Sequence, residues 1–154
     1  MGPVVSTCFR VRYGETDQMG FVFNAHYLSW FEMGRTEFCR ALSRPYTLWE
    51  KEGLFLPVVE ASIRYKNPLR YDDRVCLKTS VREVTPYSIT FAYKVIREED
   101  SRVAAEGTTK HAFCDESGKL VREPEPFYGW LLKQLEQTME EVVPRERKTD
   151  IARK

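Results

Sequence analysis

The first chemistry that the sequence offers is a carboxylate placed shortly before a long apolar helix. Asp17 lies in the polar stretch 14–20, and a helix is expected to begin at Asn24. The first turn of a helix leaves backbone N–H groups unpaired, at the positive end of the helix dipole. Those amides can hold negative charge that develops on a carbonyl oxygen, while the carboxylate attacks the carbonyl carbon or deprotonates water. Spacing alone leaves open that Asp17 merely closes a turn or caps a short helix.

Several familiar catalytic patterns are absent from the sequence. It contains no G-x-S-x-G elbow, no G-x-x-x-x-G-K-[ST] loop, no G-x-G-x-x-G and no H-E-x-x-H. The two histidines, His26 and His111, do not complete a metal-ligand pattern with the cysteines, so no metal site is predicted. We interpret the four cysteines as small buried or half-buried thiols of a reducing compartment. They are Cys8, Cys39, Cys76 and Cys114.

Length and charge exclude several classes of protein. The 154 residues fit one domain with a substantial core. Lys and Arg number 24 against 23 Asp and Glu, and this balance argues against a nucleic-acid binder. No apolar run approaches the ~20 residues that cross a bilayer. The sequence therefore predicts a cytoplasmic protein with no membrane span.

Hydrophobic periodicity predicts an α+β domain. Alternation with a period of two indicates strands over residues 7–13, 59–65, 75–81, 89–95 and 103–113. Tyr27, Phe31, Gly34 and Phe38 form the stripe of an amphipathic helix over 24–42, with Asn24 as its N-cap. A short helix is expected near 47–52, and another after residue 126 with its stripe reaching residue 142. The domain is thus placed at 1–142, and the tail 143–154 is expected to be disordered.

The order of these elements suggests how they pack. One strand, one long helix and an antiparallel run of four strands place the helix on one face of a sheet. Free sheet edges invite pairing with a second copy, so we expect an oligomer.

One segment resembles a known family. Tyr13-x-x-Thr16-Asp17-x-x-Gly20-x-Val22-Phe23-x-x-x-Tyr27 is similar to the motif of hotdog-fold acyl-CoA thioesterases of the 4-hydroxybenzoyl-CoA thioesterase and YbgC type. Segment 65–73, with its tyrosine, proline and paired aspartates, and segment 107–111 give weaker support. The resemblance covers roughly residues 5 to 137.

The resemblance implies a fold, a reaction and a site. It implies a hotdog fold, in which an antiparallel β-sheet wraps around a central α-helix, and assembly into a homodimer or homotetramer. It implies hydrolysis of an acyl-CoA, or of an acyl carrier protein thioester, without a cofactor. Asp17 would be the catalytic carboxylate, and the backbone N–H of Asn24 would polarise the thioester carbonyl. Gly20 would let the loop pass close to the substrate, and Tyr27 would either shape the acyl pocket or belong to the core.

Two departures from the family pattern stand beside the resemblance. Many YbgC-type members have histidine where this chain has Asn24, and the turn 85–88 lacks the basic cluster that holds nucleotide phosphates in some relatives. Other cations would then be needed for the phosphates of coenzyme A, and the candidates are Arg64, Lys66, Arg70 and Lys110. The acyl group is left undetermined, since Tyr13, Phe23 and Trp30 could line an aromatic pocket or fill the core.

Two other functions stay open from the sequence. A hotdog dehydratase would need a histidine paired with an acid, and neither histidine matches that pattern. A non-catalytic module that binds acyl-CoA or acyl carrier protein would need no Asp17 at all.

Overall fold

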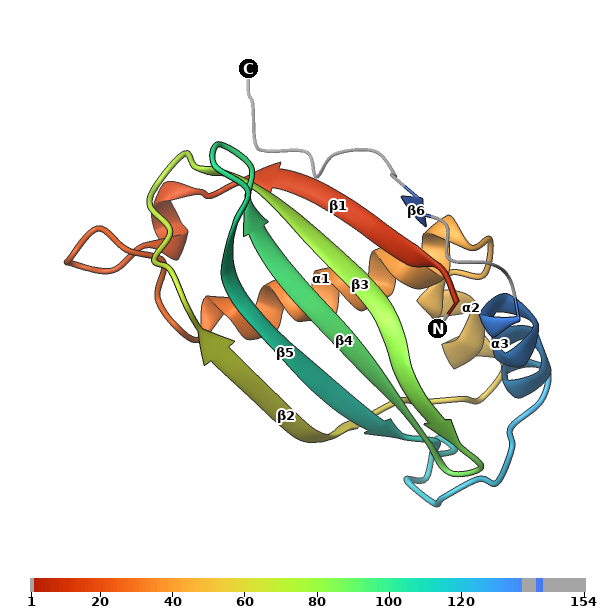
Figure 1. Cartoon of the computed structure of the whole chain (residues 1–154). Helices are drawn as coiled ribbons and strands as arrows, with labels where there is room; N and C mark the ends of the chain where they lie inside the picture. Colours follow the sequence, from red (N-terminus) through yellow and green to blue (C-terminus); the bar gives the residue numbers. More distant parts are fainter. Residues whose placement is uncertain (1, 137–140, 143–154) are drawn as a thin grey trace.

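The computed structural model describes residues 2–136 and 141–142, and it contains one mixed sheet with three α-helices. A single-turn 3₁₀ helix over Tyr13–Glu15 follows the first strand. The helices and strands, in chain order (Figure 1), are β1 Val4–Arg10, α1 His26–Ala41, α2 Tyr46–Lys51, β2 Val58–Tyr65, β3 Arg74–Thr85, β4 Ser88–Arg97, β5 Arg102–Ala112, α3 Phe127–Leu135 and β6 Glu141–Val142.

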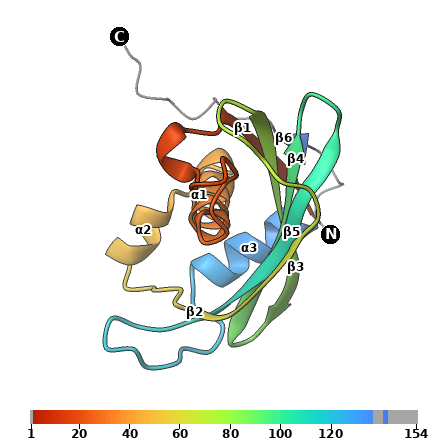
Figure 2. The same ribbon diagram turned by 90° about the vertical axis from the view of Figure 1, so that its left-hand side faces the viewer.

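The sheet has the strand order β2-β5-β4-β3-β1-β6. All neighbouring strands are antiparallel except β1 and β6, which are parallel. Figure 2 shows α1, α2 and α3 on one side of the sheet, with α1 along its middle. The five antiparallel strands with their central helix confirm the expected hotdog fold, and among the described strands β2 forms a free edge.

Close packing explains the glycine on the apolar stripe of α1. A Cβ atom at Gly34 would lie 2.5 Å from Thr79 Oγ1 and 2.8 Å from Leu77 Cδ2, so only glycine lets α1 approach β3 this closely. One turn earlier, the Phe31 ring stacks on Tyr93 of β4 with 4.2 Å between centroids. The α1–sheet contact is therefore a tightly fitted aromatic core.

Several predicted boundaries were wrong by a few residues. The strand predicted over 7–13 is β1, which ends at Arg10, so Tyr13 begins the 3₁₀ turn and is 76% exposed. Helix α1 begins at His26, and Ala25 occupies the N-cap position that was predicted for Asn24. The last predicted helix ends at Leu135, and Val142 instead belongs to the short strand β6. The tail 143–154 lies outside the described residues.

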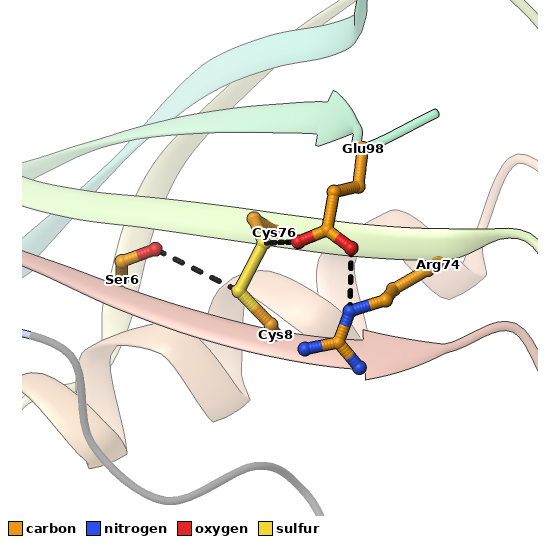
Figure 3. The surroundings of a disulfide bond; sticks show 5 residues. All are labelled: Ser6, Cys8, Arg74, Cys76 and Glu98. Carbon is orange, nitrogen blue, oxygen red and sulfur yellow. Dashed lines mark hydrogen bonds and ion pairs between the residues drawn. A yellow bond between two sulfur atoms is a disulfide. The ribbon is translucent and has the colours of Figure 1, made fainter. Parts of the chain in front are cut away.

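The interpretation of all four cysteines as thiols was also wrong. Cys8 and Cys76 form a disulfide bond between β1 and β3 (Figure 3). The antiparallel register places these residues directly opposite one another, although they are 68 residues apart in the sequence. That separation is why the pairing could not be read from spacing. Cys39 and Cys114 are free and buried.

Candidate active site

Asp17 closes a tight turn through one of its two carboxylate oxygens. Its Oδ1 accepts hydrogen bonds from the amides of Met19 at 2.9 Å and Phe21 at 3.2 Å. The Gly20 amide donates to the Asp17 carbonyl at 3.0 Å, and the Asp17 amide donates to the Phe21 carbonyl at 2.8 Å. Within the described part of the chain, Oδ2 accepts no hydrogen bond. The turn thus holds the carboxylate in place and leaves one oxygen available.

Gly20 has a backbone reason to be glycine. Its φ is +84°, in the left-handed region that favours glycine, and a Cβ there would meet only Arg70 Nη1 at 3.6 Å. It does not line the hollow described below. The turn accounts for Gly20, whereas close approach of a substrate to this residue stays a prediction.

A buried carboxylate that was not predicted from the sequence anchors this loop to the helix. Glu15 is 5% exposed, and its Oε2 accepts a hydrogen bond from Trp30 Nε1 of α1 at 2.9 Å. Its Oε1 accepts one from the Arg12 amide at 2.8 Å, and Nη2 of the Arg12 guanidinium lies 3.5 Å from Oε2. The Glu15 carbonyl also accepts a hydrogen bond from the Phe23 amide at 2.9 Å. The two ends of the loop that bears Asp17 are thereby tied to each other, and Glu15 ties the loop to Trp30 of α1.

The start of α1 carries backbone amides without acceptors. The amides of Asn24 and Ala25 donate no hydrogen bond to any described residue, whereas the next amide, of His26, donates to the Phe23 carbonyl at 2.9 Å. The Tyr65 hydroxyl donates to the Asn24 carbonyl at 3.0 Å, which fixes the helix start against the end of β2. Unpaired amides at a helix start are groups that can stabilise negative charge on an oxygen.

Asp17 and this helix start face the same hollow, of about 460 Å³. Ten residues line it: Asp17, Phe21, Val22, Phe23, Asn24, Tyr27, Tyr65, Lys66, Asn67 and Pro68. The structure therefore brings together three of the four predicted site residues and leaves out Gly20. Phe21 of the loop, Tyr65 at the end of β2 and segment 66–68 of the β2–β3 connection join them. Only the family-like segment 65–73 hinted at this second group.

The aromatic residues that the sequence suggested for the acyl pocket do not all lie at the hollow. Tyr27 is 3% exposed, yet its ring borders the hollow and contacts Tyr65 edge-on at 5.2 Å. Burial raises the pKa of Tyr27 to about 12, so its phenol stays neutral near neutral pH. Phe23 borders the hollow, Trp30 lies in the core, and Tyr13 packs against Tyr71 at the surface.

Neither histidine lines the hollow. His111 is buried in the core, where Nδ1 lies 2.8 Å from the Leu56 carbonyl and Nε2 lies 2.8 Å from Thr109 Oγ1. Burial lowers the pKa of His111 to about 4, so the ring is neutral and internally bonded. No described residue supplies the histidine–acid pair of a dehydratase at this site.

Of the suggested phosphate-binding cations, only Lys66 lines the hollow. Its ammonium is ion-paired with Glu106 at 2.9 Å. The Arg70 guanidinium lies over the Phe21 ring, 4.3 Å from its centroid. Among the described residues, one group of potential metal ligands gathers, Cys8, Cys76 and Glu98, but its two sulfurs are already bonded to each other.

A helix enclosed by an antiparallel sheet, with a carboxylate-bearing loop before the helix, defines the hotdog class of domains. The model of the Thioesterase-like superfamily matches residues 11–135, and the chain belongs to that family.

Individual proteins support this assignment. The chain is 35% identical over 112 residues to "Acyl-CoA thioesterase YbgC" of Haemophilus influenzae, covering 72% of this chain and 80% of the relative. Among solved structures, the DHNA-CoA thioesterase from Staphylococcus aureus superposes with a TM-score of 0.82 at 26% identity, over 91% of this chain and 99% of that one. The gentisyl-coenzyme A thioesterase BH1999 gives a TM-score of 0.72 at 29% identity, over 78% and 96% of the two chains.

Proposed function

We propose that this protein hydrolyses acyl-CoA thioesters at the hollow that Asp17 borders. The observation that carries the proposal is that Asp17, with one carboxylate oxygen available, and Asn24, whose helix-start amide has no described acceptor, line the same hollow. Membership of the thioesterase family and the names of the relatives agree with it. The products are a free carboxylic acid and the thiol of coenzyme A.

The amide of Asn24 is proposed to hold the thioester carbonyl oxygen. As negative charge develops on that oxygen, a fixed N–H donor at the positive end of α1 stabilises the transition state more than the ground state. Only the main chain of Asn24 is needed, so the absence of a histidine side chain there does not remove this role.

Asp17 Oδ2 then acts in one of two ways. As a general base it takes a proton from water, the resulting hydroxide attacks the carbonyl carbon, and the C–S bond breaks as the thiolate leaves. As a nucleophile it attacks the carbon directly, expels the thiolate and forms an anhydride, which water hydrolyses. In both routes Oδ1 remains held by the turn amides while Oδ2 reacts.

We further propose an aromatic acyl group. Phe21, Phe23, Tyr27 and Tyr65 give the hollow aromatic walls close to the carboxylate. Two structural neighbours are named for aromatic acyl-CoA substrates, which agrees with this proposal. Benzoyl-CoA should therefore be hydrolysed with a higher kcat/KM than an aliphatic acyl-CoA of similar size. Comparison with the matching acyl carrier protein thioesters identifies the carrier.

The edge strand β2 is proposed to pair with the β2 of a second copy. Val59 is 58% exposed and Val58 is 48% exposed, so two neighbouring apolar side chains of this edge strand lie open to solvent in the single copy. Such pairing builds a homodimer, and two dimers would form the homotetramer. Light scattering should give a multiple of the monomer mass, and Ala61→Pro in the edge strand should reduce it.

Residence in the cytoplasm is also our proposal, to be checked by fractionation of the source cells. In a reducing cytoplasm the Cys8–Cys76 pair would be open to reduction. Thiol counting in rapidly acid-quenched cells reports its state there.

Asp17→Asn is the deciding experiment. Asparagine keeps the size of the side chain and can accept the turn hydrogen bonds through its carbonyl oxygen, but it is a negligible base and a poor nucleophile. We expect kcat to fall about 10²–10⁴-fold with little change in melting temperature or oligomer mass. Steady-state release of free thiol measures the rate, and binding of acyl-CoA measures whether the site persists.

The chain offers a matched control. Asp115 closes a turn of the same design, with Oδ1 accepting from the amides of Ser117 at 2.9 Å and Lys119 at 3.0 Å. Asp115→Asn should leave kcat unchanged. An Asp17 variant that kept most of its turnover while folded would remove this residue from the mechanism, and a wild type that bound acyl-CoA without hydrolysing any thioester would favour the binding module.

A further inference from the structure

The face of the sheet opposite α1 contains a second hollow, of about 510 Å³. Because Leu77 and Thr79 of β3 point toward α1, their neighbours Lys78 and Ser80 point to the other side. Figure 2 shows the three α-helices only on the α1 side of the sheet, and Figure 1 views the opposite side. The sheet therefore lies between this hollow and α1.

A row of small side chains crosses the outer face at this point. Ser62 of β2 is paired with Thr108 of β5, Thr108 with Ala92 of β4, and Ala92 with Ser80 of β3. Four adjacent strands spaced about 4.8 Å apart make this row about 14 Å long. The hydroxyls of Ser62, Ser80 and Thr108 form no hydrogen bond with another described residue, so they remain available to a ligand.

Long cationic side chains border this row. The next row along the strands pairs Arg64 with Glu106, Glu106 with Lys94, and Lys94 with Lys78. Arg82 of β3 lines the hollow from its other side. Four cations thus surround a hollow whose lining includes one carboxylate.

Most of this positive charge is not neutralised nearby. Glu106 is ion-paired with Lys66 at 2.9 Å. Within residues 2–136 and 141–142, Arg64, Arg82 and Lys94 form no ion pair. The positive potential is consistent with the pKa of Glu106, which is lowered first by its hydrogen bond to Lys66 and then by the charges of Lys66, Lys94 and Arg64.

We propose that this outer hollow is a second binding site for a small anion that carries two or more phosphate groups. Guanidinium and ammonium groups bind phosphate oxygens through charge-assisted hydrogen bonds, and hydroxyls on the floor supply further donors. The volume is that of a small-molecule site. A second copy stacked on this face by a two-fold axis would instead set cations against cations, which disfavours self-association there.

The source of the phosphates can be a free polyphosphate or a phosphorylated nucleoside such as the adenosine end of coenzyme A. The proposal does not depend on thioester hydrolysis, because binding is measured without a thioester. Inorganic tripolyphosphate and adenosine 3′,5′-bisphosphate are therefore titrated separately into the wild-type protein, by calorimetry at low ionic strength. Tighter binding of the first identifies a polyphosphate site, and tighter binding of the second a nucleotide site.

The double variant Arg64→Gln/Lys94→Gln tests the location. We expect the affinity for the better probe to fall about a hundredfold, since each charge-assisted contact contributes roughly tenfold. The matched control is Lys51→Gln/Lys119→Gln, which removes the same charge from exposed lysines outside this hollow. Both variants should melt like the wild type, and neither changes a residue of the Asp17 hollow.

Three outcomes would overturn the proposal. The first is no heat of binding for either probe at millimolar concentration. The second is an equal loss of affinity in the two double variants, which would indicate general charge attraction. The third is a smaller oligomer mass in Arg64→Gln/Lys94→Gln only, because the face would then belong to a contact between copies.

Discussion

Two turns in this protein have almost the same backbone and different surroundings. Asp17 and Asp115 each precede a left-handed glycine by three residues, Gly20 with φ +84° and Gly118 with φ +86°. In both turns the glycine amide donates to the aspartate carbonyl, and the aspartate Oδ1 accepts from amides two and four residues ahead. As pieces of local structure they are equivalent.

The two turns differ in the residues that surround them. The Asp17 turn borders the hollow at the start of α1, whereas the Asp115 turn lies beside residues 50–53, which include Glu50 and Glu52. The Asp115 Oδ1 also accepts a hydrogen bond from Ser117 Oγ at 2.7 Å, and the Asp17 turn has no counterpart, since Met19 occupies that position. An Asp-x-x-Gly turn is therefore common structure, and chemistry depends on what the turn faces.

Among changes that keep both aspartates, breaking the anchor of the Asp17 turn should have the largest effect on this comparison. Glu15→Gln leaves one acceptor oxygen for two donors, the Trp30 indole and the Arg12 amide. We expect kcat/KM to fall about ten- to a hundredfold because the carboxylate loop shifts, with about 1–3 kcal/mol lost in unfolding free energy. Kinetics and urea melts measure both.

Trp30→Phe removes the indole N–H that donates to Glu15 and keeps an aromatic ring. It should therefore reproduce most of the fall in kcat/KM expected for Glu15→Gln. Normal kcat/KM in folded samples of both variants would show that Glu15 does not position the loop.

Replacing the glycine of each turn by alanine should have a smaller effect on kcat. Gly20→Ala and Gly118→Ala each force an L residue into the left-handed region, at a cost of about 1–2 kcal/mol. Melting temperatures should fall alike in the two variants, while only Gly20→Ala lowers kcat measured well below the melt. If Gly118→Ala lowered kcat equally, the two turns would not be functionally distinct.

The smallest effect is expected in the titration of the Asp115 turn. The pKa of Asp115 is lowered, first by its hydrogen bond from Ser117 and then by that from the Lys119 amide. Its contribution to stability is present above the unfolded pKa and is lost as pH falls through the lower folded value. Ser117→Ala should raise this pKa toward the ordinary aspartate value, as followed by NMR of the side-chain carboxyl. No change in the pKa would contradict the assigned cause.

The fold could be predicted from the sequence because its periodicities are strong. Buried positions of β3 and β4 alternate as expected, and the stripe of α1 reaches the sheet through Gly34. Boundaries were less accurate where hydrogen bonds outside the periodic pattern decide them. Tyr13, for example, follows the alternation of β1, but its segment turns away as a 3₁₀ helix.

The site could be predicted only in part. Asp17 and Tyr27 were predicted from their motif and Asn24 from its place at the helix start; all three line the hollow, and their roles stay predictions. Glu15 was missed because a carboxylate two residues from Asp17 is indistinguishable from a solvated loop charge until Trp30 is seen to cover it. Tyr65 was missed as a site residue because its contact with Asn24 joins residues 41 apart.

The Cys8–Cys76 bond gives the chain the topology of a closed ring with two free ends. The ring contains the Asp17 turn, α1, α2 and β2, whereas the Asp115 turn lies on the longer free end. In the chain-entropy account, closing a ring of this size lowers the conformational entropy of the unfolded state, which stabilises the folded state by about 4 kcal/mol. A peptide bond cut inside the ring leaves its two fragments joined through sulfur. A peptide bond cut after Cys76 leaves two fragments that no covalent bond joins.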